Sequence, residues 1–312
     1  MTATDLPVTA PSRTVSVKPI VLPAPQRGSD LHVRVSAPVV GERLPIVVFA
    51  HGFGSNLDGY APLVDYWSAR GFVVVQPTHL DSKRPAVPID DPRKPDVWRH
   101  RVQDMKRILD ELDTLEAAVP GLAGRTDRGR IVAAGHSFGG QTAGILVGLR
   151  VTDPRTGTAE DLSDGRVTAS IQLATAGKGG DELTPFAHEN LPWLRDQDFS
   201  HITVPHLVVA GDEDEVGLST RGPAWTVDPY LLSGSTHKSL LTVHGGQHFL
   251  GGISGYEVAE TTDENPERVA LVQQVTLAYL RHVTGIDSTG WAKTQAALTE
   301  VAAHRLGRLT SP

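Results

Sequence analysis

Short apolar runs recur along the chain with lengths that suit the strands of a sheet. The clearest runs, 45–50, 131–134 and 205–211, are continuous rather than alternating. A continuous apolar run of this length is typical of a parallel strand that is covered on both faces. The other strands that we expect are an antiparallel pair at 15–22 and 31–36, and single strands at 72–76, 168–174 and, as the last of the chain, 239–243.

Amphipathic segments lie between these runs and predict helices. The strongest covers 97–119, where apolar side chains recur at alternating spacings of four and three residues. That period places them on one face of a single long helix. Further helices are expected at 58–70, 138–149, 265–282 and 291–306. Because strands alternate with helices, the sequence predicts the α/β class, with a mostly parallel central sheet flanked by helices.

The chain is long enough for one large α/β domain, and it contains neither an internal repeat nor a low-complexity linker. We expect a single domain over 15–312, preceded by a flexible arm over 1–14 that is rich in Thr, Pro and Ala. Residues 150–165 are polar and rich in turn formers, which indicates an insertion. Residues 177–201 carry paired glycines, two prolines and a tryptophan, and we expect them to form a short-helix lid or rim over a site.

Composition narrows the classes of partner. Hydrophobic residues make up 39% of the 312 positions and charged residues 21%, which is ordinary for a globular enzyme. The formal net charge is -7 and no stripe of lysine or arginine is present, so no nucleic-acid partner is expected. The absence of cysteine excludes disulfides and fits a reducing compartment. No segment has the pattern of a signal peptide or a membrane span, so we expect a cytoplasmic protein, although the mature form of a secreted enzyme would show the same features.

The run 131–134 leads into Gly135-His136-Ser137-Phe138-Gly139, which fits the G-x-S-x-G pattern of a nucleophile elbow. A serine on a sharp strand-to-helix turn needs neighbours without Cβ, so that its backbone can take a strained conformation and expose Oγ. The first amides of the helix that follows would point toward the serine. Alone, the pentapeptide also fits an ordinary turn, and partners elsewhere in the chain decide between the two interpretations.

Candidate partners for Ser137 follow three other predicted strands. His51-Gly52-Phe53-Gly54 is either a tight turn or the loop that supplies one oxyanion-hole amide. Acidic residues 212–215 lie at the carboxyl end of a parallel strand, where ligands gather in such sheets. His248 follows the last predicted strand.

These residues stand in the order nucleophile, acid, base, which is Ser137, an acid within 212–214, and His248. The histidine would take the serine proton, and the carboxylate would fix the imidazole tautomer. The backbone amides of Phe53 and Phe138 are the expected oxyanion hole, which would hold the negative oxygen of a tetrahedral intermediate.

Residues 45–282 resemble the α/β-hydrolase superfamily, and within it the branch of platelet-activating-factor acetylhydrolases, chlorophyllases, and dienelactone-hydrolase-like and cutinase-like esterases. The resemblance implies the α/β-hydrolase fold, with Ser137 as nucleophile and His248 as base. The motifs that carry it are His51-Gly52-Phe53-Gly54, Gly135-His136-Ser137-Phe138-Gly139-Gly140, Gly211-Asp212-Glu213-Asp214 and Gly246-Gln247-His248-Phe249.

The position of the acid departs from part of this branch. Acetylhydrolases of this type usually take their acid from the strand after the elbow helix, and here that strand ends in Leu173-Ala174-Thr175 without a carboxylate. The acid site is therefore more similar to that of cutinases and dienelactone hydrolases. In the superfamily the acid commonly lies three residues beyond a glycine such as Gly211, which selects Asp214. We expect Asp212 to bond backbone amides of its own turn.

The resemblance implies a serine esterase that cleaves a small-molecule carboxylic ester through an acyl-enzyme. Acyl transfer, lyase chemistry and plain ligand binding are the alternatives, because one fold hosts all of these functions. No cofactor is expected, and no metal, because the histidines show no ligand spacing such as H-E-x-x-H. His136 is expected to be a packing or hydrogen-bonding neighbour of the elbow. No feature of the sequence predicts the oligomeric state.

Overall fold

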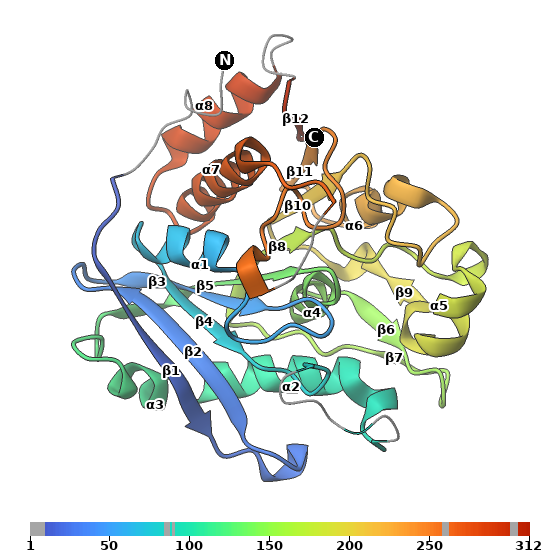
Figure 1. Ribbon diagram of the computed structural model, residues 1–312, viewed down its shortest axis with the longest axis horizontal. Helices are drawn as coiled ribbons and strands as arrows, with labels where there is room; N and C mark the ends of the chain where they lie inside the picture. The colour runs from blue at the N-terminus through green and yellow to red at the C-terminus, as the bar shows by residue number, and fades with distance from the viewer. Residues whose placement is uncertain (1–9, 84–87, 89–90, 258–261, 300–304) are drawn as a thin grey trace.

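A mixed β-sheet with helices on both of its faces forms the centre of the computed structural model (Figure 1). The structure describes residues 10–83, 88, 91–257, 262–299 and 305–312. Within these residues the main sheet has nine strands, in the spatial order β1-β2-β4-β3-β5-β8-β10-β11-β12. Their bounds are β1 Thr14–Leu22, β2 Leu31–Pro38, β3 Leu44–Ala50, β4 Val73–Pro77, β5 Thr126–His136, β8 Val167–Leu173, β10 His206–Gly211, β11 Lys238–Val243 and β12 Gly307–Thr310.

The strands from β4 to β11 in this order run parallel, and antiparallel strands close both edges of the sheet. β1 pairs antiparallel with β2, which confirms the pair that the sequence predicts, and β2 pairs antiparallel with β4. At the other edge β12 pairs antiparallel with β11. The predicted α/β class and parallel strands are therefore confirmed for the centre, and the edges make the sheet as a whole mixed.

The helices form a layer on each face of the sheet. Side chains alternate along each strand, so that Val47 and Phe49 pack with α1, α7 and α8 on one face, and Ile46 and Val48 pack with α2, α3 and α4 on the other. The bounds are α1 Ala61–Ser68, α2 Val97–Asp110, α3 Leu112–Ala118, α4 Phe138–Leu146, α5 Pro185–Asn190, α6 Asp228–Leu232, α7 Pro266–Val283 and α8 Ser288–Thr299.

The predicted extents of two helices are wrong. The single helix expected over 97–119 is interrupted at Glu111, whose backbone (φ -105, ψ 21) leaves the helical conformation, and both parts still bury leucines in the same core. The final helix expected over 291–306 corresponds to α8, which ends at Thr299, and residues 305–306 form a turn. Residues 300–304 of that prediction lie outside the described part.

The expectation that 239–243 is the last strand is also wrong, because β12 follows it. Gly307–Thr310 contains one leucine and no apolar run. Pairing with β11, from Leu240 opposite Thr310 to Val243 opposite Gly307, makes this segment a strand. Local pattern cannot show a strand that exists only through its neighbour.

The predicted insertion and the predicted rim are joined by a small sheet of their own. β6 Arg150–Thr152 pairs antiparallel with β7 Ala159–Glu160 and with β9 Gln197–Asp198. The chain between β8 and β10 therefore leaves the main sheet, contributes α5 and β9, and returns. It forms a separate small element at one end of the molecule, seen at the right of Figure 1.

The predicted N-terminal arm falls largely on residues 1–9, which lie outside the described part. Ser12 is described, and both its amide and its hydroxyl donate to the carbonyl of Ala69 at the end of α1, at 2.7 and 3.1 Å. Thr14 already belongs to β1. Among the described residues, no helix has the length and apolar character needed to cross a membrane.

Parallel strands bring the predicted site residues to one edge of the sheet. Ala50 at the end of β3 lies in register with Gly135 on β5, and Gly211 at the end of β10 lies in register with Val243 on β11. The loops that leave these four strands carry Phe53, Ser137, Asp214 and His248. The carboxyl ends of neighbouring parallel strands lie side by side along one side of the sheet, so the topology brings the four loops together there.

Candidate functional site

Ser137 lies on a strained turn between β5 and α4. Its backbone has φ 55 and ψ -122, a region that side chains with a Cβ seldom occupy. The turn is fixed on its other side by a hydrogen bond from the Ser137 amide to the carbonyl of Leu173 on β8, at 2.8 Å. The backbone strain of the turn is therefore at Ser137 itself.

The two glycines of the motif serve close packing. A Cβ on Gly135 would lie 2.2 Å from the Gly139 carbonyl oxygen, and a Cβ on Gly139 would lie 2.0 Å from the carbonyl oxygen of Ala50. Neither glycine has a positive φ. The sequence argument assigned their role to backbone strain, and the structure assigns it to the contact between the elbow and β3.

Ser137, His248 and Asp214 form one hydrogen-bonded chain. The Ser137 Oγ lies 2.9 Å from Nε2 of His248, and Nδ1 of the same ring lies 3.1 Å from each carboxylate oxygen of Asp214. Asp214 is fully buried, whereas the side chain of His248 is 21% exposed. A carboxylate accepts, so Nδ1 donates to Asp214, and a neutral ring then presents Nε2 to Ser137 as an acceptor.

Two other carboxylates hold the loop that carries His248. Asp212 Oδ1 accepts from the Gly245 amide at 2.6 Å, and Asp263 Oδ2 accepts from the amides of Gln247 and Gly251 at 2.7 and 2.9 Å. The expectation that Asp212 bonds amides of its own turn is corrected, because its partner lies in the loop after β11. Asp212 thus fixes the histidine loop, and Asp214 is the carboxylate that reaches the imidazole.

The amides predicted for an oxyanion hole border the same cavity as Ser137. Phe53 and Phe138 both line it. Phe138 is the first residue of α4, so its amide has no acceptor within the helix. Among the described residues, the amide of Phe53 has no protein acceptor either. Both N–H groups are available to a ligand.

A buried hydrogen-bond chain links the loop after β3 to the histidine loop. His136 Nε2 lies 2.7 Å from the carbonyl oxygen of His248, which can only accept, so Nε2 carries the proton. Nδ1 then accepts from the Tyr60 hydroxyl at 2.8 Å, and the Tyr60 oxygen accepts from the Gly52 amide at 3.0 Å. Burial lowers the pKa of His136 to about 3, so the ring stays neutral at ordinary pH. The expected role of His136 as a hydrogen-bonding neighbour is confirmed.

A cavity of about 710 Å³ opens beside Ser137 and His248. Its wall is mostly apolar, and part of it comes from 177–201, the segment predicted to form a lid or rim. That segment contributes Phe186, Leu191, Trp193 and Leu194. The Trp193 ring stacks on the Phe138 ring with centroids 5.4 Å apart, so the rim packs directly on the elbow.

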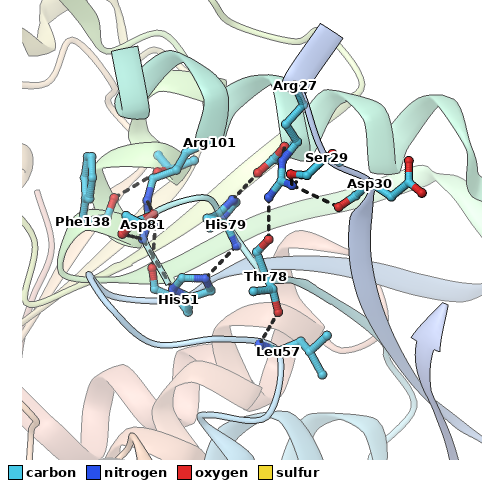
Figure 2. A network of polar contacts seen from close by, with 12 residues as sticks. Arg27, Ser29, Asp30, His51, Leu57, Thr78, His79, Asp81, Arg101 and Phe138 are labelled. Carbon is cyan, nitrogen blue, oxygen red and sulfur yellow. Dashed lines mark hydrogen bonds and ion pairs between the residues drawn. The ribbon is translucent and has the colours of Figure 1, made fainter. Parts of the chain in front are cut away.

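Sequence reasoning missed a buried polar network under the loop after β3 (Figure 2). Arg101 on α2 is fully buried and pairs with Asp81, and His79 bonds Asp104 on the same helix at 2.9 Å. A signal was present, because Arg101 and Asp104 fall on the apolar face of α2 with Trp98 and Met105. A charge on a buried helical face requires a partner, which makes such positions visible in a sequence.

No group of three or more His, Asp or Glu side chains in the described part of the chain is arranged to hold a metal ion. A scan of the sequence against models of known protein families finds no match, and a search of curated proteins finds none. The geometry of the site is therefore the ground on which a function can be proposed.

Proposed function

We propose that the protein is a serine hydrolase of the α/β-hydrolase fold that cleaves carboxylic esters through an acyl-enzyme. The hydrogen-bonded chain from Asp214 through His248 to Ser137 carries this proposal. An isolated serine hydroxyl is a weak nucleophile, and a neutral imidazole at 2.9 Å supplies the base that it needs. The elbow, the two available amides and the adjoining cavity add support.

The reaction would begin when Ser137 Oγ attacks the ester carbonyl carbon and its proton passes to His248 Nε2. The carbonyl oxygen then becomes an oxyanion, held by the amides of Phe53 and Phe138, while Asp214 stabilises the imidazolium. When the tetrahedral intermediate collapses, the C–O bond to the alcohol breaks and the alcohol takes the proton from His248. Water then attacks the acyl-enzyme with His248 as base, which releases the acid and regenerates Ser137.

The cavity favours esters with an apolar group. Trp193 and Trp225 lie on its wall, and Val216 and Leu218 add aliphatic surface from the chain after β10. Transfer of an apolar group from water to such a wall gains roughly 25 cal/mol per Å² of buried area. We therefore expect kcat/KM to rise with the length of the acyl or alcohol chain until the cavity is filled.

The experiment is hydrolysis of p-nitrophenyl esters of increasing chain length, with fluorophosphonate labelling in parallel. Ser137→Ala should abolish both turnover and labelling, because no other hydroxyl in the described residues approaches His248 Nε2. Ser55→Ala is a matched control, because Ser55 lines the same cavity and its Oγ has no partner. Labelling that persists in Ser137→Ala would contradict the proposal.

The alternatives need further measurements, because acyl transfer shares the first half of this reaction and plain binding shares none of it. Acyl transfer is tested by adding a primary alcohol and measuring partition of the acyl group between water and the alcohol. A protein that binds esters without breaking them would show saturable binding and no burst of p-nitrophenol. Either result would replace ester hydrolysis as the function.

A further inference from the structure

The peptide between Gly52 and Phe53 is held by its carbonyl. The Gly52 oxygen accepts from His51 Nδ1 at 2.7 Å and from the Ser55 amide at 3.2 Å, and Arg101 Nη2 approaches it at 3.4 Å. In a trans peptide the C=O and the following N–H point in opposite directions. The Phe53 N–H is therefore directed away from these donors, and rotation of this peptide would change its direction.

His51 is locked in the tautomer that this arrangement requires. The His79 amide donates to Nε2 of His51 at 3.0 Å, so Nε2 is the acceptor and Nδ1 carries the proton. Burial, followed by the nearby charge of Arg101, lowers the pKa of His51 well below its usual value. The ring stays neutral, and its one N–H always faces the Gly52 carbonyl.

Arg101 joins the two halves of the proposed oxyanion hole. Its Nη1 donates to the His51 carbonyl at 2.7 Å, and its Nε and Nη2 donate to Asp81 at 2.9 and 2.6 Å. The guanidinium carbon lies 4.3 Å from the centre of the Phe138 ring, a cation–π contact with the residue that follows Ser137. Figure 2 shows Arg101 between Phe138, Asp81 and His51.

Asp81 keeps this cation in place. Burial by itself would raise the pKa of the Asp81 carboxyl, but the charge and hydrogen bonds of Arg101 outweigh burial and lower the pKa to about 2. The pair is therefore ionised at any ordinary pH, and the planar fork of arginine serves both the carboxylate and the loop carbonyl. A lysine could not, because its compact ammonium cannot reproduce these separate directions.

We propose that Arg101 and His51 are positioning residues for the oxyanion hole, which fix the Gly52–Phe53 peptide with its N–H toward the substrate oxygen. Arg101 also packs on the ring of Phe138, the residue that carries the second oxyanion donor. The inference rests on the proposed esterase function. Neither residue touches the reacting atoms, and their effect passes through the backbone.

The test measures kcat per active site, with active sites counted by phosphonate titration. Arg101→Lys and His51→Leu should each lower kcat about 10²-fold, the size expected when one oxyanion donor is misplaced. KM should stay within about twofold, because the donors act on the transition state rather than on the bound ester. His51→Asn can place an amide N–H where Nδ1 stands and should recover most of the loss.

Arg99→Lys is the matched control. Arg99 lies on α2 two residues before Arg101 and pairs with Asp153 and Glu160, neither of which belongs to the oxyanion loop. This variant should lower stability and leave kcat per titrated site unchanged. A merely structural role for Arg101 would give the same pattern in Arg101→Lys, with fewer active sites of normal kcat.

The outcomes separate this inference from the function on which it rests. If wild-type protein has no esterase activity, or if Ser137→Ala keeps it, the proposed function fails. If activity depends on Ser137 and both Arg101→Lys and His51→Leu keep wild-type kcat per site, the inference fails alone. Should Arg101→Lys not fold, the two His51 variants decide, together with a crystal structure of phosphonylated wild-type protein. That structure must show the phosphonyl oxygen bonded to the amides of Phe53 and Phe138, and a different donor in place of the Phe53 amide overturns the inference.

Discussion

The two sides of Ser137 hold their histidines in opposite ways. On one side, the His248 ring is 21% exposed and bonds a buried carboxylate. On the other side, His51 and His79 are completely buried, and burial followed by the charge of Arg101 lowers the pKa of both rings well below the usual value. The histidine that is proposed to exchange a proton, His248, borders the cavity. The histidines that hold the loop, His51 and His79, are buried and neutral.

One buried aspartate on each side shows a second difference, and Asp104, the other buried aspartate on the His51 side, contacts both His79 and Arg27. Asp214 faces an imidazole, whereas Asp81 faces Arg101. Arginine keeps its charge at any pH compatible with folding, so the Asp81 pair is a permanent anchor. An imidazole can change its charge in the physiological range, which suits a pair that takes part in chemistry. The comparison predicts that substitutions on the two sides differ in what they change.

The largest effect is expected from Asp214→Asn, which should lower kcat by roughly 10⁴-fold. An asparagine favours the tautomer of His248 with its proton on Nε2, where the ring cannot accept from Ser137. The measurement is steady-state kinetics with thermal melts. Asp212→Asn is the control, because its oxygen can still accept from Gly245 and its kcat should stay near wild type. A larger catalytic loss at position 212 would reverse the assignment.

The next effect concerns acid stability. Burial lowers the pKa of His206, on β10 away from the cavity, to about 4. An unfolded histidine titrates near 6.5, so the unfolded state takes up a proton as pH falls below that value while the folded state does not. This ring does not lower the free energy of unfolding above about pH 6.5. As the pH falls from 6.5 toward 4, protonation of the unfolded state lowers that free energy, by about 2 kcal/mol at pH 5 for this one ring. Denaturant unfolding of wild type and His206→Asn at pH 7.5 and 5 measures it, and equal pH dependence in the two proteins would show that the ring is not held neutral.

Tyr60→Phe tests the bridge between the two sides. The variant removes the donor to His136 and the acceptor for the Gly52 amide, and it should lower the free energy of unfolding by about 1–2 kcal/mol. A several-fold loss of kcat is expected as well, because both loops around Ser137 lose a fixed point. Tyr66→Phe is the control, because Tyr66 lies on α1, the helix that begins directly after Tyr60, and is partly buried; it should change neither quantity by much. If Tyr60→Phe behaves like that control, the two sides are held independently.

The smallest effect is expected at the rim. Phe186 is 62% exposed and lines the cavity, so Phe186→Ala should leave stability and kcat for short esters unchanged. For long-chain esters KM should rise about fivefold, which corresponds to roughly 1 kcal/mol or about 40 Å² of lost apolar contact. Leu231→Ala removes a similarly exposed side chain outside the cavity and serves as control. An equal loss for short and long esters would mean that the rim acts on the reacting groups.

The sequence predicts the parts of this molecule that have local signals. Continuous apolar runs mark the parallel strands, and the motifs at their ends place Ser137, Asp214 and His248 in loops that the topology brings together. The roles of these residues in catalysis remain predictions. The reason for Gly135 and Gly139 was not predictable, because the contact with Ala50 depends on how β5 packs beside β3.

Other features depend on residues far apart in the chain and leave little local trace. The Tyr60 hydroxyl and the His136 ring are separated by 76 positions, and neither has a neighbour in sequence that indicates the bond. β12 exists through its pairing with β11. Arg101 is predictable in part. Its position on the apolar face of α2 can be recognised in the sequence, but the residues that it contacts cannot.

The hydrogen-bond chain from Gly52 through Tyr60 and His136 to the His248 carbonyl bears on how this pocket could diversify during evolution. It ties both loops beside Ser137 into one unit, so a substitution that shifts one loop disturbs the other. The residues 177–201 that line the cavity take no part in that chain, and they are attached through their own small sheet and the stacking of Trp193 on Phe138. New substrate preferences are therefore expected to arise first in this segment, because substitutions there can change the shape of the cavity without disturbing the hydrogen-bond chain that holds the loops beside Ser137.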